Sequence, residues 1–241
     1  MNYFTKYFLL LVLLIYFINC ERLYVPPRPA SVFKEASYNH RFRQWRYEDN
    51  QKEIIWFEDG KLFREAKKEN QLYHGVYIQY FRNGSISQKG NYDQGYRVGE
   101  WVYYFPNGKI YLTLHYLKFP IDKNKFVLNG EFGNENGPYI RYYDNGQVEE
   151  MGTYYAGSFH QKRIRFYKNG KKQFEIFYNQ GKKNGTAKFY DSEERLLHEE
   201  YYQNDLLEKL ISYRFVNNQP IINFISFYKD NQLINIDFRN E

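Results

Sequence analysis

A turn signature that returns at a fixed spacing constrains this chain more than any other feature. An aromatic pair, one or two polar residues and a turn dipeptide follow one another five times, each time ending on a glycine. These slot glycines are Gly60, Gly84, Gly108, Gly146 and Gly170. Asn-Gly and Asp-Gly favour positive φ at both central positions of a tight hairpin turn. The signature therefore predicts strands that end, turn tightly and start again.

The residues between these turns predict an all-β fold. Side chains before the turn alternate, so Trp101, Tyr103 and Phe105 are expected on one face of a strand. A second glycine cluster, such as Gly95 and Gly99, lies between successive turns. Beyond the first twenty residues the sequence shows no convincing amphipathic helical period. Each unit is thus predicted as strand, glycine loop, strand and Asn-Gly turn.

The slot returns after about 24 residues, except at two longer intervals. The first long interval runs from Gly108 to Gly146, and the second runs from Glu194 to Asn231. Both fall at the same place in the cycle, which predicts an internal duplication with a period of about 86 residues. The segments expected to correspond are 115–143 and 200–228. Each would carry an insertion of about 14 residues that forms a long projecting hairpin.

The first twenty residues form an element of their own. Lys6 precedes an unbroken apolar run of twelve residues, Tyr7 to Ile18. Twelve helical residues cover roughly 18 Å, whereas a hydrocarbon core is about 30 Å thick, so the run fits the h-region of a signal peptide. Charged residues and three prolines follow, and proline cannot continue a helix. We expect a signal peptide over 1–19, a proline-containing tether over 20–38 and the repeat domain over 39–241.

The single cysteine, Cys20, lies at the end of the apolar run. It excludes a disulfide within one chain and a cysteine-rich zinc site. Its position resembles the bacterial lipoprotein signal, in which the cysteine thiol receives a lipid (palmitate and related acyl chains) and the peptide is cut just before it. The resemblance implies cleavage after Asn19, although residues 17–19 depart from the usual Leu, small residue, then Gly, Ala or Ser. Plain secretion and an uncleaved anchor are the alternatives.

No motif for catalysis, a metal or a cofactor stands out. The five histidines lie far apart, and the glycines form no phosphate-binding loop. Neighbouring carboxylates such as Glu149 and Glu150 are expected on opposite faces of a strand. The 34 basic and 28 acidic residues are interleaved, without the block of like charge typical of a nucleic-acid arm. We therefore expect no enzyme, no cofactor and no nucleic-acid partner.

The fullest copy of the repeat runs from Gly90 to Gly108 as Gly-x-Tyr-x-x-Gly-x-x-x-Gly-x-Trp-x-x-Tyr-Phe-x-Asn-Gly. This pattern resembles the MORN-repeat variant of the bacterial YwqK-type antitoxin family, over about residues 54–235. The resemblance implies an elongated, single-layer antiparallel β-meander that forms a curved or twisted open sheet. It also implies an interaction module rather than a catalyst.

Aromatic side chains are the expected binding surface, because they make up 21% of the chain and dominate interface hot spots. The candidate residues are Tyr80, Tyr92, Trp101, Tyr103, Phe105, Tyr142, Tyr154, Phe166 and Tyr178. We expect a scaffold in the bacterial cell envelope, on the outer membrane or the periplasmic face, or exposed at the cell surface. Its partners would be envelope proteins, the membrane through the lipid anchor, and a second copy through the open sheet edge. The alternatives are binding to a lipid surface, antitoxin-like or immunity-like binding, and an adhesin or self-assembling element.

Overall fold

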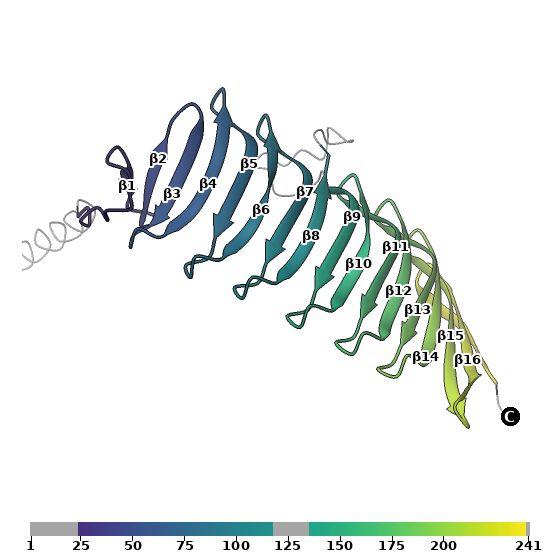
Figure 1. Ribbon diagram of the computed structural model, residues 1–241. Helices are drawn as coiled ribbons and strands as arrows, with labels where there is room; N and C mark the ends of the chain where they lie inside the picture. Colours follow the sequence, from purple (N-terminus) through teal and green to yellow (C-terminus); the bar gives the residue numbers. More distant parts are fainter. Residues whose placement is uncertain (1–23, 118–134, 240–241) are drawn as a thin grey trace, which may run out of the picture.

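The computed structural model describes residues 24–117 and 135–239, which form 17 β-strands and, within these ranges, no helix (Figure 1). The strands are β1 (Ser37–Asn39), β2 (Gln44–Glu48), β3 (Lys52–Phe57), β4 (Leu62–Glu69), β5 (Leu72–Tyr80), β6 (Ile86–Asp93), β7 (Tyr96–Tyr104), β8 (Ile110–Tyr116), β9 (Glu135–Tyr142), β10 (Val148–Tyr155), β11 (Ser158–Phe166), β12 (Lys172–Asn179), β13 (Lys182–Tyr190), β14 (Leu196–Gln203), β15 (Leu206–Val216), β16 (Gln219–Lys229) and β17 (Gln232–Phe238). The prediction of an all-β fold is confirmed.

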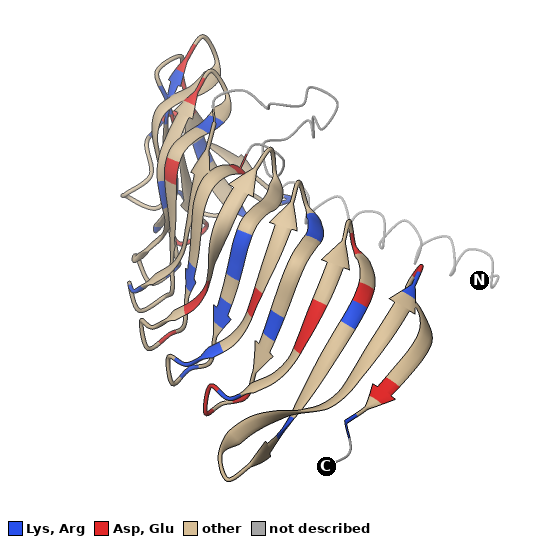
Figure 2. Ribbon diagram, turned by 90° about the vertical axis from the view of Figure 1, so that its right-hand side faces the viewer, with Lys and Arg blue, Asp and Glu red and all other residues tan. Residues whose placement is uncertain are grey.

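Each strand pairs antiparallel with the next strand of the chain, from β1–β2 to β16–β17. The result is the expected single-layer, open meander, elongated and twisted along its length (Figure 1). Lysine, arginine and the acidic residues are scattered over strands and turns, with the two signs interleaved (Figure 2). No helix capable of crossing a membrane occurs in the described part of the chain.

The slot glycines lie in turns along one long side of the sheet, here called the Asn-Gly side. All five have φ between 82° and 90°. At Gly84, the glycine N–H donates to Phe81 O (2.9 Å) and the Phe81 N–H donates to Ser85 O (2.8 Å). Asn83 keeps a negative φ, and its Oδ1 accepts from the Ser85 N–H at 3.0 Å. The loop therefore closes on a single bulge glycine, rather than on the predicted two-residue turn with positive φ at both positions.

Two-residue turns with positive φ at both positions line the opposite side of the sheet. Asn70 and Gln71 form one with φ of 51° and 67°, and Gln94 and Gly95 form the next with 49° and 85°. These positions belong to the segments predicted as glycine loops. Among the described turns from β3 to β14 the two sides thus use different turns, while the two-residue form occurs on the Asn-Gly side at Asn217 and Asn218.

The predicted equivalence of 115–143 and 200–228 is wrong. In the first segment β8 pairs directly with β9, whereas the second spans the end of β14, all of β15 and most of β16. Asn217 and Asn218 join β15 to β16, with φ of 51° and 64°. Asn218 follows Glu194 at the regular slot spacing, so the slot position after Glu194 is Asn218 and not Asn231. The turn at Asn231 follows one strand later and lies on the opposite side of the sheet. An aromatic pair precedes this polar turn, so its sequence is similar to the slot signature. Residues 118–134, the centre of the first predicted insertion, lie outside the described residues.

The folded body begins before residue 39. Val32, only 2% exposed, packs with Trp45 and Trp56 on one face of β2 and β3. Ser31 Oγ donates to Gly60 O at 2.7 Å, which fixes the same segment to the Asn-Gly side. The later part of the predicted tether is therefore a second layer over the first strands. The predicted signal peptide and the Asn19–Cys20 cleavage site lie outside the described residues.

Candidate functional site

Aromatic rings from β5–β8 pack together on one face of the sheet, here named the tyrosine face after Tyr73, Tyr77, Tyr92 and Tyr116. Trp101 lies at the centre of this cluster and is 0% exposed. The centroid of its ring lies 5.4 Å from that of Tyr77 and 5.1 Å from that of Tyr92. Rings thus bury one another on a face that no second layer of described strands covers, and they supply a core that a bare single-layer sheet would lack.

The position of Trp101 depends on a glycine of the neighbouring strand. A Cβ atom on Gly90 would lie 2.3 Å from Trp101 Cδ2, so the indole lies directly over the backbone of β6. Trp101 Nε1 also donates to Asn91 O at 3.1 Å. The close approach explains why the repeat carries glycine at the position across from its tryptophan.

A second row of rings continues the tyrosine face over β9–β12. Tyr139 lies 5.5 Å from Tyr154, Tyr154 stacks on Phe159 at 4.5 Å, and Phe159 lies 5.6 Å from Tyr178, all between ring centroids. The row places one ring on each of four successive strands. The tyrosine face is therefore continuous over most of the sheet.

Arginine guanidinium groups lie on these rings at cation–π distance. Arg97 Cζ is 4.2 Å from the centroid of Trp101, and Arg163 Cζ is 4.5 Å from that of Phe159. Arg64 Cζ lies 5.9 Å from the ring of Tyr73 and 5.8 Å from that of Tyr77. Because each side chain is held by rings and polar contacts, the face presents positive charge in fixed places.

Arg97 donates to the hydroxyl groups of three tyrosines. Its Nη1 donates to Tyr103 Oη at 2.7 Å, with longer bonds from Nε to Tyr92 Oη (3.4 Å) and from Nη1 to Tyr116 Oη (3.5 Å). Burial raises the pKa of Tyr103 and of Tyr116 above the ordinary value of 10.0. These hydroxyls therefore stay neutral at physiological pH and orient the guanidinium group without cancelling its charge.

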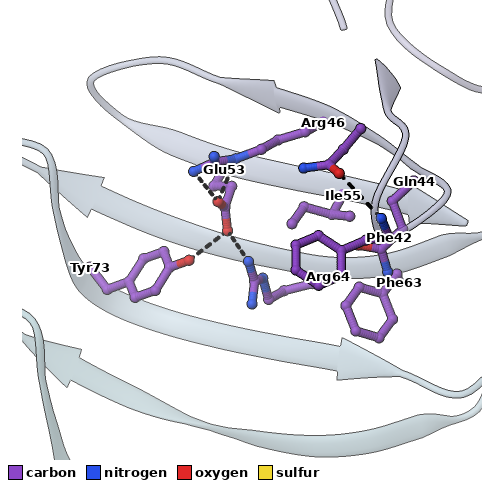
Figure 3. Close-up of a pocket in the computed structure, with 9 residues that line it drawn as sticks. Phe42, Gln44, Arg46, Glu53, Ile55, Phe63, Arg64 and Tyr73 are labelled. Carbon is purple, nitrogen blue, oxygen red and sulfur yellow. Dashed lines mark hydrogen bonds and ion pairs between the residues drawn. The ribbon is translucent and has the colours of Figure 1, made fainter. Parts of the chain in front are cut away.

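Near the first strands, the tyrosine face holds a buried carboxylate (Figure 3). Glu53 is 1% exposed, and its Oε1 accepts from Arg46 Nε at 2.9 Å. Its Oε2 pairs with Arg64 Nη2 at 2.7 Å and accepts from Tyr73 Oη at 2.6 Å. The carboxylate is thus well satisfied by two guanidinium groups, of which Arg46 also pairs with Glu48.

A cavity of about 440 Å³ lies beside this cluster. Arg46 and Arg64 line it together with the apolar side chains Phe42, Ile55 and Phe63 (Figure 3). Arg64 Nε is buried and has no hydrogen-bond partner within the described part of the chain. The site offers cationic donors next to apolar walls, a combination suited to a carboxylate flanked by an apolar group.

A second buried carboxylate cluster lies on the same face at β9–β11. Glu150 Oε1 pairs with Arg163 Nε at 2.7 Å and accepts from Tyr139 Oη at 3.0 Å. Arg141 Nη2 donates both to Glu150 Oε2 (3.0 Å) and to Glu149 Oε1 (3.1 Å). The prediction that Glu149 and Glu150 lie on opposite faces is wrong, because a register shift at the start of β10 turns both toward one arginine.

The Glu150 cluster stabilises the ionised carboxylate. Burial alone would raise the pKa of Glu150, but the hydrogen bond and charge of Arg163, together with Tyr139 and Arg141, outweigh burial and hold that pKa below the ordinary value of 4.5. A carboxylate shared by two arginines and a tyrosine joins three strands. Its role is therefore to hold the face in place.

Five of the predicted surface residues belong to the tyrosine face. Tyr92, Trp101 and Tyr103 lie in the first cluster, while Tyr154 and Tyr178 lie in the second row. Trp101 cannot contact a partner directly, because neighbouring rings and the Gly90 backbone enclose it. The other four are half-buried.

The remaining four predicted residues lie elsewhere. Tyr80 Oη donates to Glu65 Oε1 at 2.5 Å, on the other face of the sheet. Phe105 packs against a ring at the start of β8, on the Asn-Gly side. Tyr142 and Phe166 end β9 and β11 beside the turns of that side. The nine residues therefore do not form one surface.

The sequence contained a signal for the residues that this list missed. Tyr77 and Trp101 occupy the same place in successive repeats, and so do Tyr92 and Tyr116. Tyr154 and Tyr178 are related in the same way. Positions one repeat apart share a face of the sheet. Adding one repeat length to the position of a known ring therefore predicts the next ring on that face.

The described residues contain no group of three His, Cys, Asp or Glu side chains that could hold a metal ion. His74 lies 3.5 Å from Glu69 and 3.4 Å from Asp93, and His198 lies 3.6 Å from Glu200. His74 thus lies between two carboxylates and His198 beside one, at separate places in the sheet.

Four segments of the chain match the family model of the MORN repeat variant. They are residues 73–94, 97–118, 135–154 and 162–180. Each MORN-variant match covers one hairpin closed on the Asn-Gly side, starting with β5–β6. The matches lie where the ring clusters are densest, and β13–β17 continue the same ladder beyond them. No curated protein matches the chain. MORN repeats are in general interaction modules for membranes or proteins.

Proposed function

We propose that this protein is an envelope-anchored lipoprotein whose tyrosine face serves as a scaffold for a protein partner. The observation that carries the proposal is the set of Arg64, Arg97 and Arg163 held on aromatic rings of an uncovered sheet face. Tyrosine, tryptophan and arginine are the residue types that dominate interface hot spots. Side chains already fixed in place lose little conformational freedom when a partner binds.

The chemistry of the face favours an acidic partner. Arg97 donates to neutral hydroxyl groups and has no carboxylate partner within the described part of the face, whereas Arg46 pairs with Glu53 and Glu48 and Arg64 pairs with Glu53. A carboxylate of the partner could bind these guanidinium groups in the bidentate geometry that arginine favours. The antitoxin-like or immunity-like role suggested by the YwqK-type resemblance would be one form of such binding.

The anchor belongs to the same proposal. The first described residues lie beside β1–β3, at one end of the elongated sheet (Figure 1). A lipid on Cys20 would therefore hold that end at a membrane and leave the rest of the sheet free for a partner. Intact mass of the native protein tests this: we expect a chain that starts at Cys20 and carries acyl groups. A chain retaining residues 1–19, or one starting at Cys20 without acyl groups, would contradict it.

Cross-linking in intact cells tests the scaffold role. Arg97→Met keeps a side chain over Trp101 but removes the charge, and we expect the partner captured by the native protein to be lost. Arg82→Met is the matched control, because Arg82 also lies over a ring (5.4 Å from the Phe57 centroid) but is exposed on the Asn-Gly side. Equal capture by both variants would reject the tyrosine face as the binding surface.

Liposome flotation separates this proposal from its main alternative. The recombinant chain from Cys20 onward, produced without acyl groups, should not float with anionic vesicles. Salt-sensitive flotation would instead favour direct binding to lipid headgroups, which the excess of basic over acidic residues would assist.

A further inference from the structure

The last strand of the described sheet, β17, has one side without a partner strand among residues 24–117 and 135–239. It carries four exposed apolar side chains: Leu233 is 51% exposed, Ile234 62%, Ile236 39% and Phe238 63%. Four large exposed apolar groups on a seven-residue strand are unusual for an edge that faces water.

The hydrogen bonds of β17 show which backbone groups point outward. Arg239 N–H donates to Asn223 O at 3.1 Å, so residue 239 faces β16. Inward and outward groups alternate along an antiparallel strand, and hence the N–H and C=O of Ile236 and Phe238 point to the free edge. These are the groups to which a further strand would bind.

β17 lacks two of the features that normally protect an edge, since it contains no lysine and no proline. The shift in its pairing with β16 falls at Ile234 and leaves the pairs from Asn235 to Phe238 in regular register. The strand at the other end, β1, is short, and the 29–36 segment packs beside it on β2 and β3. Natural sheets protect edges by such short strands, covering segments, lysines or bulges.

We propose that β17 pairs antiparallel with β17 of a second copy of this chain, about a two-fold axis at Ile236. The strand is complementary to itself in this register. Ile236, which lies opposite the buried Ser226 on β16, meets its own copy on the tyrosine face, with Phe238 of each chain beside the pair. On the other face Asn235 lies opposite Asp237, so polar groups meet polar groups. The tyrosine faces of the two copies then form one continuous surface.

This inference does not depend on what the tyrosine face binds, since it rests only on the edge strand. The mass of the native full chain, purified in detergent and measured by light scattering across a dilution series, should correspond to two chains per particle. Ile236→Pro is the decisive variant. Its lost N–H points away from β16, so the fold should keep its circular dichroism and tryptophan fluorescence while the particle falls to one chain. Ile236→Val keeps the N–H and should remain paired.

Three results would overturn the proposal. In the first, the native protein is a monomer at every concentration. In the second, Ile236→Pro remains a dimer, which places the contact between copies elsewhere. In the third, a photo-crosslinker at residue 238 would capture a different protein and no second copy, which assigns the edge to a heterologous strand. Val76→Lys changes an exposed apolar position on an inner strand. It is the control for non-specific association through exposed apolar side chains and should stay dimeric.

Discussion

The two ends of the sheet differ in how their apolar side chains are covered. At the first strands, residues 29–36 fold back over Trp45 and Trp56, and Val32 is almost wholly buried between them. At the last strand, Leu233 and Phe238 remain more than half exposed. A single-layer sheet gains stability from each added strand or covering segment, so one end is closed by its own chain and the other is left for a second molecule.

The middle of the sheet explains why neither end is needed to form a core. Trp101 is enclosed by rings of its own face, and Gly90 gives it room. Each strand pairs through its backbone only with its neighbours, and side chains such as Tyr73 and Tyr77 reach one strand further, so a change should act over a few strands at most. The difference between the two ends can therefore be tested end by end.

The largest effect should come from the covered end. Trp56→Ala removes a buried ring that packs against Phe33 at 5.2 Å and should lower the free energy of unfolding by about 3–5 kcal/mol. Phe238→Ala, the matched change at the open end, should cost less than about 1 kcal/mol in a single chain. Chemical denaturation in an Ile236→Pro background compares the two without dimerisation. Equal losses would mean that the ends are packed alike.

A smaller difference should separate two slot glycines. Gly60 and Gly84 have φ of 82° and 89°, so alanine at either position should cost about 1–2 kcal/mol in the left-handed region. A Cβ on Gly60 would also lie 2.5 Å from Pro29 Cβ, whereas nothing lies within 4 Å at Gly84. Gly60→Ala should therefore lose about 1–3 kcal/mol more than Gly84→Ala. Thermal unfolding of the two variants measures this, and identical midpoints would show that the 29–36 segment does not cover the Asn-Gly side.

The smallest expected effect is a loss of stability in acid that should not affect the last strands of the sheet. The pKa of Glu150 is lowered on folding, so its contribution to stability is present above the ordinary value of 4.5 and is lost as the pH falls through the folded pKa. The protection of amides in β9–β11 against exchange, relative to their intrinsic rates, should therefore fall in acid more than that of amides in β16–β17. Glu150→Gln should abolish the difference, and an unchanged acid response in that variant would assign it to other carboxylates.

Much of this fold could be predicted from local chemistry, and some of it could not. The regular spacing of the slot glycines predicts the hairpin meander, because each turn fixes where a strand ends. The same argument gives a wrong slot at the aromatic pair Phe227-Tyr228, because the signature does not show on which side of the sheet a turn lies.

The composition of the site was harder to predict than its strands. Alternation along a strand places Glu149 and Glu150 on opposite faces, and only the register shift beside them brings both to Arg141. A ring suited to an interface by type can also be enclosed by its neighbours, as Trp101 is. Packing between strands decides both points, and one strand's sequence does not contain it.

Amide exchange of the native chain, followed along the sequence at high and at low protein concentration, tests the contrast between the ends most directly. We predict that the amides of Trp45 and Trp56 are protected at both concentrations. The amides of Ile236 and Phe238 should be protected only when the protein is concentrated, and should exchange freely on dilution. Protection at residues 236 and 238 that does not change with dilution, or that is absent throughout, would contradict an open edge completed by a second copy.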